Sequence, residues 1–216
     1  EDRLYALDRN GNEVNELSFE IDSGENNIAV SIFDYEKNRN YRFVVTNDNK
    51  IEMFDSRGKK VSGFKPNTFE SSIIKSPVHI RIDGKDFIIV QLENGDLKIL
   101  DRRGRDRINI DEQIQFSENS IYSYMKTFTT TDNQGYLVQI DLDGKLSKKN
   151  LNITSDNLID IKNDNLVYIS ENILSIKGIN INLPFGRYSK PKIFNESSRM
   201  LIGISDFSEN NIYLYE

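Results

Sequence analysis

A short phrase recurs along the chain and strongly limits the folds it can adopt. Residues 4–11, 51–58, 97–104 and 137–144 each begin with alternating apolar positions and end in Asp-x-x-Gly. Alternation with period two indicates a half-buried β-strand. Asp at the first corner of a turn, followed by Gly where the backbone needs positive φ, is typical of a tight turn. We therefore assign these positions to the structural turns of a repeat: Asp8, Gly11, Asp55, Gly58, Asp101, Gly104, Asp141 and Gly144.

The repeating unit contains four strands. In the clearest unit they are expected at 28–33, 41–46, 50–54 and 60–64, and the next unit repeats this order from residue 78. The glycines of successive phrases are 47, 46 and 40 residues apart. This spacing fits the roughly 40 to 45 residues of a four-stranded propeller blade.

We predict an all-β chain that forms a β-propeller of four-stranded antiparallel blades, with about five to six blades in a ring that can be complete or incomplete. A long β-sandwich is the second choice, because it would show no four-strand period. The prediction is a single domain, 1–216, which we divide as follows: a partial blade at 3–22, blades at 28–66, 77–110, 120–153 and 157–184, and a partial blade at 191–216.

Composition excludes several functional classes. The chain has no Cys and a single His, which rules out disulfides, thiol nucleophiles and multi-His metal sites within it. The net charge is -6, with both signs interspersed, so we expect no nucleic-acid binding. No apolar run approaches the ~18 residues of a membrane-spanning helix. We expect no cofactor and no metal.

One dense basic stretch is the candidate binding site. It contains Arg102, Arg103, Arg105 and Arg107, which could hold a phosphate or a sulfated sugar by bidentate contacts. The alternative is a solvated hairpin tip, because the acidic residues Asp101 and Asp106 are neighbours of these arginines. His79 lies within an alternating strand, where packing explains it better than catalysis. The segments 132–135 and 141–144 resemble calcium loops but lack the required ligand spacing, so we interpret them as hairpin turns.

The stretch from Leu4 to Val14 resembles the strand and turn of the quinoprotein (PQQ-like) propeller repeat, and 51–61 and 97–108 resemble it less closely. The chain also looks like the repeat regions of large bacterial envelope proteins, some of which carry a ribonuclease HII label. The resemblance implies a propeller fold. Quinoprotein blades usually carry a Trp after the turn, and this chain has none.

The function we expect is a non-enzymatic interaction or scaffold module of a larger bacterial protein, in contact with protein or glycan. The alternative is a propeller-type enzyme, glycan-acting or quinone-dependent, with its site at the central channel. The start at Glu1 suggests a piece of a longer protein, and a cell-envelope or periplasmic location is favoured over the cytoplasm. The last strand, 211–216, is expected to be an open edge that could pair with another copy.

Overall fold

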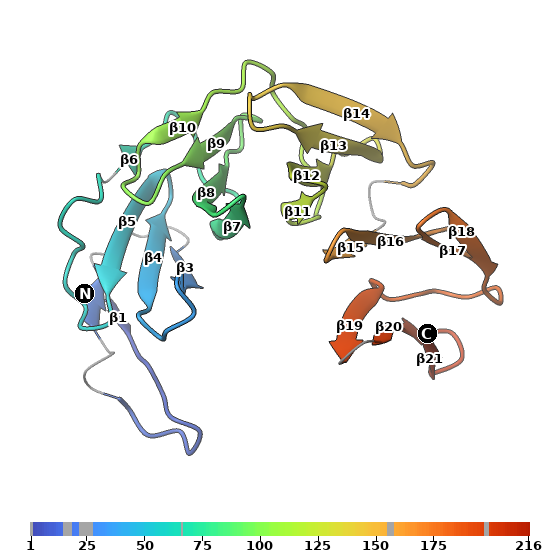
Figure 1. Cartoon of the computed structure of the whole chain (residues 1–216). Coiled ribbons are helices and arrows are strands. Elements are labelled where there is room, and N and C mark those ends of the chain that lie inside the picture. Colours follow the sequence, from blue (N-terminus) through green and yellow to red (C-terminus); the bar gives the residue numbers. More distant parts are fainter. Residues whose placement is uncertain (1, 15–18, 22–27, 66, 155–157, 197–198) are drawn as a thin grey trace. The chain divides into compact units, whose positions relative to one another are not determined.

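The computed structural model describes residues 2–14, 19–21, 28–65, 67–154, 158–196 and 199–216. These residues contain strands and turns but no helix, and the chain divides into two compact units, Glu1–Gln113 and Ile114–Glu216. No helix in the described part is long and apolar enough to cross a membrane. Each unit is a series of antiparallel sheets in which strands adjacent in sequence pair with each other (Figure 1).

Unit 1 contains a strand pair and two four-stranded sheets. The pair is β1 (Asp2–Leu4) with β2 (Phe19–Ile21), and residues 15–18 and 22 of this predicted partial blade lie outside the described residues. The first sheet is formed by β3 (Ile28–Phe33), β4 (Arg42–Asn47), β5 (Lys50–Asp55) and β6 (Asn67–Thr68). The second sheet is formed by β7 (Val78–Ile82), β8 (Lys85–Gln91), β9 (Leu97–Leu100) and β10 (Asp106–Ile108).

Unit 2 contains two four-stranded sheets and one three-stranded sheet. The first has β11 (Tyr122–Tyr124), β12 (Thr127–Thr131), β13 (Tyr136–Ile140) and β14 (Leu146–Asn150). The second has β15 (Ile159–Lys162), β16 (Asn165–Ser170), β17 (Ile173–Ile176) and β18 (Ile179–Asn182). The third has β19 (Lys192–Glu196), β20 (Arg199–Asp206) and β21 (Asn211–Tyr215).

The Asp-x-x-Gly phrase forms the same turn four times. In the first copy, Oδ1 of Asp8 accepts hydrogen bonds from the N–H groups of Asn10 and Asn12, and the Gly11 N–H donates to the Asp8 carbonyl. The same three bonds recur around Asp55, Asp101 and Asp141. Each aspartate therefore satisfies the backbone of its own turn. The turns at Asp55, Asp101 and Asp141 lie where the third strand of a four-stranded sheet ends.

The cores lie between neighbouring sheets of one unit. In unit 1, Val44, Ile51 and Met53 of the first sheet pack with Ile88 and Val90 of the second. In unit 2, the inner face of β19–β21 packs in the same way on β15–β18. The central strands are apolar on both faces because each is covered from both sides. The clearest case is β8, in which the successive apolar residues Phe87, Ile88, Ile89 and Val90 are all buried.

One strand prediction is wrong. We expected a fourth strand at 60–64, but the structure has only an isolated bridge between Phe54 and Lys60 and forms β6 at Asn67–Thr68. Gly63 has φ +91 and bends the chain out of the extended conformation. This turn directs Phe64 into the core of unit 1, where it is buried.

Candidate functional site

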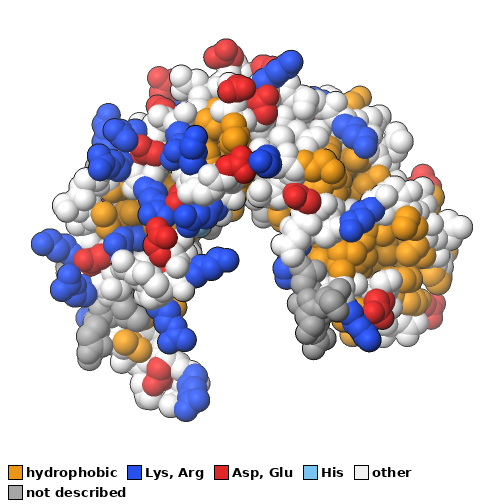
Figure 2. Space-filling view, in the orientation of Figure 1, with side chains coloured by type: hydrophobic (Ala, Val, Ile, Leu, Met, Phe, Trp, Pro, Cys, Tyr) orange, Lys and Arg blue, Asp and Glu red, His pale blue; other side chains and the backbone are white. Residues whose placement is uncertain are grey.

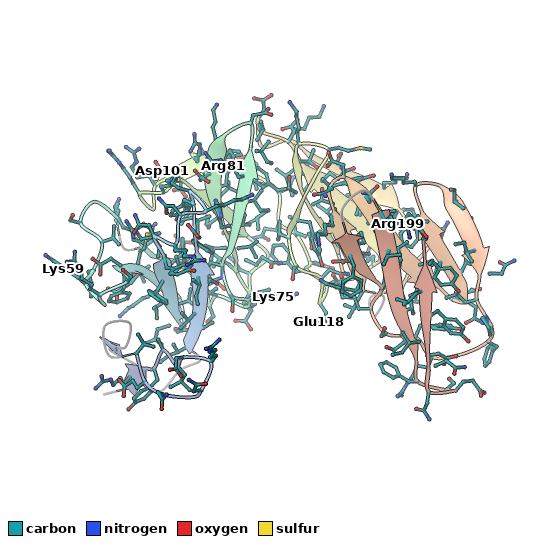
Figure 3. The ribbon with its side chains drawn as sticks, turned by 60° about the horizontal axis from the view of Figure 1, so that its bottom comes forward. Lys59, Lys75, Arg81, Asp101, Glu118 and Arg199 are labelled. Atoms are coloured by element: carbon teal, nitrogen blue, oxygen red, sulfur yellow. The ribbon has the colours of Figure 1, made fainter. Side chains whose placement is uncertain are left out.

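The four arginines of the basic stretch lie around one shallow recess on the second sheet of unit 1. The recess has a volume of about 290 Å³ and forms where the β7–β8 hairpin meets the turn between β9 and β10. Figure 3 shows Asp101 and Arg81 at this end of the sheet. The lining residues are Gly84, Lys85, Asp86, Asp101, Arg102, Arg103, Arg105 and Arg107.

Asp86 forms the floor of the recess. Its side chain is 5% exposed, and its Oδ1 lies 2.7 Å from Nε2 of His79. Arg102 donates from Nε to Oδ2 of Asp86 over 2.7 Å and also pairs with Glu36. Arg81 lies 3.8 Å from the same carboxylate. The buried charge is therefore compensated by neighbours from two separate segments of the unit, β7 and the turn between β9 and β10.

Aromatic rings hold this network in position. The Arg102 guanidinium stacks over the ring of Tyr35 at 4.5 Å, and His79 meets the same ring edge-on at 4.8 Å. Burial raises the pKa of Tyr35, and its hydroxyl is buried with no hydrogen-bond partner among the described residues. Arg102 is thus fixed from two sides, by a carboxylate and by an aromatic face.

Arg105 is also paired. It donates from Nε and from Nη2 to Oδ2 of Asp101, over 2.9 and 2.7 Å. Burial alone would raise the pKa of Asp101, but hydrogen bonds from Arg105 and from the N–H groups of Arg105 and Arg103 lower it below the ordinary value. Asp101 therefore both builds the turn and neutralises one arginine of the recess.

Three positive charges remain uncompensated. Arg107 donates from Nη1 to the backbone carbonyl of Asp86 over 3.2 Å, and its guanidinium lies 4.9 Å from the ring of Phe87. Arg103 is exposed, and its backbone carbonyl accepts from the N–H of Lys65. Within the part of the chain that the structure describes, Arg103, Arg107 and Lys85 have no carboxylate partner. The recess can therefore bind an anionic group.

The sequence missed Lys85 and the floor residue Asp86. Both belong to the β7–β8 hairpin, about twenty residues before the basic stretch. The signal that could have found them is the strand order: in an antiparallel sheet, the β7–β8 turn lies at the same end as the β9–β10 turn. The Asp-Gly at 83–84 marks that first turn in the sequence.

A second polar cluster lies in unit 2, beside a recess of about 420 Å³ lined partly by Lys190. Nζ of Lys190 donates to the hydroxyl of Tyr122 over 2.6 Å, and that hydroxyl donates to the carbonyl of Ile159. Burial raises the pKa of Tyr122 to about 12 and lowers the pKa of Lys190, although Asp160 acts on Lys190 in the opposite direction. The Lys190 ammonium group and the Tyr122 hydroxyl are therefore hydrogen-bonded to each other, and the hydroxyl also to the backbone.

The His, Asp and Glu residues considered in the sequence analysis do not come together as a metal site in the described part of the chain. The described residues include no group of three or more His, Asp or Glu side chains that could hold a metal ion. Asp132 of the calcium-like stretch caps a hairpin turn, since its Oδ1 accepts from the N–H groups of Gln134 and Tyr136.

Comparisons with known proteins identify the fold. No family model and no curated protein matches the chain. Among solved structures, BBS1N in complex with ARL6DN is similar at 15% identity and a TM-score of 0.61, covering 86% of this chain and 62% of that chain. BamB from Moraxella catarrhalis is similar at 14% identity and a TM-score of 0.51, covering 81% and 57%. The computationally designed protein Ika8 is similar at 12% identity and a TM-score of 0.55, covering 87% of this chain and 61% of that chain.

The similar structures are β-propellers, so the predicted all-β fold of antiparallel four-stranded blades is confirmed. The chain spans less than two thirds of the length of each of these three proteins. At these identities the similarity shows the fold alone.

Proposed function

We propose that this chain is a non-catalytic β-propeller interaction module that binds an acidic segment of a partner protein at the arginine-lined recess. One observation carries the proposal: Lys85, Arg103 and Arg107 surround the recess without carboxylate partners in a chain whose net charge is -6. Local positive charge on an acidic chain is a feature that selects anionic partners.

The network beneath the recess supports binding over catalysis. Asp86 and His79 are held by each other and by Arg102, and Asp101 is held by Arg105. A general acid or base needs a proton-transfer site that faces the substrate. Here the carboxylates instead orient two arginines, which gives the recess a rigid floor and leaves the other cations free to contact a ligand.

A protein partner is favoured over a glycan by the shape of the site and by the use of the fold elsewhere. The recess is shallow and open, and its chemistry is that of guanidinium groups, which pair with side-chain carboxylates. The similar propeller BBS1N was solved in complex with ARL6. The PQQ-like repeat type is a further proposal, supported by the phrase at 4–14. An envelope location is another, supported by the resemblance of the whole repeat pattern to the repeat regions of bacterial envelope proteins.

A matched pair of variants tests the proposal. Fluorescence anisotropy with a labelled octaglutamate peptide at low salt compares the wild type with the double variant Arg103→Ala, Arg107→Ala. We expect about a tenfold loss of affinity, which corresponds to about 1.4 kcal/mol. The control Arg57→Ala, Lys59→Ala removes the same charge from an exposed turn of the same unit and should change the affinity less than about twofold.

Two results would contradict the proposal. An equal loss of affinity in both double variants would show nonspecific attraction. Tighter, recess-dependent binding of a sulfated oligosaccharide than of the peptide would identify a glycan as the ligand. Circular dichroism of each variant verifies that it is folded.

A further inference from the structure

A loop of unit 2 presents an almost fully exposed aromatic side chain. Phe185, between β18 and β19, is 94% exposed, more than any other large apolar side chain in the described part of the chain. Figure 2 shows hydrophobic side chains gathered on the surface of this unit. A single exposed apolar residue is ordinary in a folded protein, so the meaning of Phe185 depends on its surroundings.

The backbone of the loop is fixed on both sides of Phe185. Before it, Leu183 is buried in the core of unit 2, and its N–H donates to the carbonyl of Asn172 over 2.7 Å. After it, the carbonyl of Arg187 accepts from the N–H of Phe207 over 2.8 Å. The backbone therefore holds the Phe185 side chain in solvent, and a partner that binds this side chain has little of the loop left to order.

A recess with room for an aromatic ring lies beside the same loop. It is the recess of about 420 Å³ described above, and Gly186, the residue after Phe185, is among its lining residues. Its apolar wall is formed by Leu158, Ile169 and Pro191. Because an apolar cavity of about 150 Å³ already holds benzene, this volume accommodates a phenylalanine side chain.

The rim of this recess carries both signs of charge. Glu171, in the turn between β16 and β17, and Arg187 both line the recess and are exposed. Among the described residues, no cation pairs with Glu171 and no carboxylate pairs with Arg187, whose guanidinium lies 5.5 Å from the ring of Phe207. The surface thus contains an aromatic side chain and a recess for one, and an acid and a base, so that it is complementary to itself.

We propose that this surface is an isologous interface between two copies of the chain. Phe185 of each copy fills the recess of the other, and Arg187 of each copy pairs with Glu171 of the other. A surface that carries both halves of each contact forms every contact twice around a two-fold axis, which is the commonest symmetry of oligomers. A buried aromatic anchor with charged residues around it is typical of a binding hot spot.

The charges favour a second copy over a partner protein of one sign. Glu171 would repel an acidic surface, and Arg187 would repel a basic one. A second copy offers both signs in the reciprocal arrangement that the rim requires. The surface belongs to unit 2 and shares no residue with the arginine-lined recess of unit 1, so this inference is independent of the proposed function.

Sedimentation velocity tests the role of the aromatic side chain. We expect the wild type to form a dimer within a range of about 1 to 100 μM. Phe185→Ser should raise the dissociation constant of the dimer about hundredfold, because both aromatic anchors are lost. The control Ile179→Ser removes an apolar side chain that is 63% exposed at the β17–β18 turn, the end of the sheet away from Glu171. It should change the dissociation constant less than about twofold.

An exchange of charges tests the pairing across the interface. Arg187→Glu and Glu171→Arg each place like charges opposite each other, so each variant alone should remain a monomer in this range. Mixed in equal amounts, the two variants should form a heterodimer, because every rim contact then joins an acid to a base. Recovery in the mixture also shows that both variants are folded.

Three outcomes would overturn the inference: a wild type that stays monomeric at about 100 μM, a dimer that Phe185→Ser leaves unchanged, or a mixture of the two charge variants that stays monomeric. The second outcome would assign the dimer to another surface. If Phe185→Ser fails to fold, the mixture of charge variants decides. Peptide binding at the arginine-lined recess is measured separately and is not affected by these results.

Discussion

Lys148 donates a hydrogen bond from Nζ to Oδ2 of Asp132 over 2.9 Å and so neutralises a carboxylate whose side chain is 2% exposed. Lys148→Met removes this donor and leaves the buried oxygen unpaired. We expect the free energy of unfolding of unit 2 to fall by about 1 to 3 kcal/mol, because an unsatisfied buried acceptor retains its full desolvation cost. Urea denaturation followed by circular dichroism measures the loss.

The neighbouring lysine provides the control for this prediction. Lys149 is exposed on the same strand and is not a partner of Asp132. Lys149→Met should change the unfolding free energy by less than about 0.5 kcal/mol. Equal effects of the two substitutions would refute the assigned role of Lys148.

Gly104 should tolerate a side chain much less well than Gly84. Both glycines have positive φ, +73 and +75, so Ala at either position costs about 1 to 2 kcal/mol of backbone strain. A Cβ at Gly104 would also lie 2.5 Å from the carbonyl oxygen of Lys65, whereas a Cβ at Gly84 meets nothing within 4 Å. Thermal unfolding should therefore show a larger decrease of Tm for Gly104→Ala. A similar decrease for both variants would contradict the close approach at Gly104.

Removal of the hydroxyl group should have different effects on stability at Tyr35 and at Tyr122. The hydroxyl of Tyr35 has no hydrogen-bond partner among the described residues, so Tyr35→Phe should leave stability unchanged or raise it by up to about 1 kcal/mol. The hydroxyl of Tyr122 donates to Ile159 and accepts from Lys190, so Tyr122→Phe should lower stability by about 1 to 2 kcal/mol. Chemical denaturation measures the free energy of unfolding of both variants. An equally large loss of stability in Tyr35→Phe and Tyr122→Phe would contradict the prediction.

Asp101 should make the stability of unit 1 depend on acid. Its pKa in the folded chain lies below the ordinary value, because the hydrogen bonds from Arg105 and from the turn backbone outweigh the effect of burial. A lowered folded pKa stabilises the fold above the unfolded value near 4, and the contribution is lost as the pH falls through the folded pKa. Asp101→Asn should lower the unfolding free energy at pH 7 and flatten its decrease between about pH 4 and 2. Urea titrations across this range test the prediction, and an equally steep acid decrease in the variant would contradict it.

The sequence was sufficient to predict the architecture because the repeat is local. Alternation and the Asp-x-x-Gly turn depend on a few neighbouring residues, and the turns around Asp8, Asp55, Asp101 and Asp141 close through bonds no more than four residues apart. The error at 60–64 has a local cause as well. Alternation there is real, but Gly63 takes positive φ and only the isolated bridge at Lys60 forms.

The candidate site was predictable only in part. The four arginines are adjacent in the sequence, but their pairing depends on distant residues: Arg102 binds Glu36, which lies 66 positions earlier. A period-two pattern shows which face a side chain occupies, not which segment covers that face. For the same reason, the sequence could not reveal that Oδ2 of Asp132 has a cation partner, whereas Oδ2 of Asp206 has no hydrogen-bond partner among the described residues.

Arginine footprinting tests the central claim most directly. Phenylglyoxal labels exposed guanidinium groups, and mass spectrometry reports the modification of each arginine with and without the octaglutamate peptide. We expect the peptide to slow the labelling of Arg103 and Arg107, while Arg57, whose side chain is 83% exposed on another turn, keeps its rate. Unchanged labelling at Arg103 and Arg107, or equal protection of Arg57, would contradict binding at the recess.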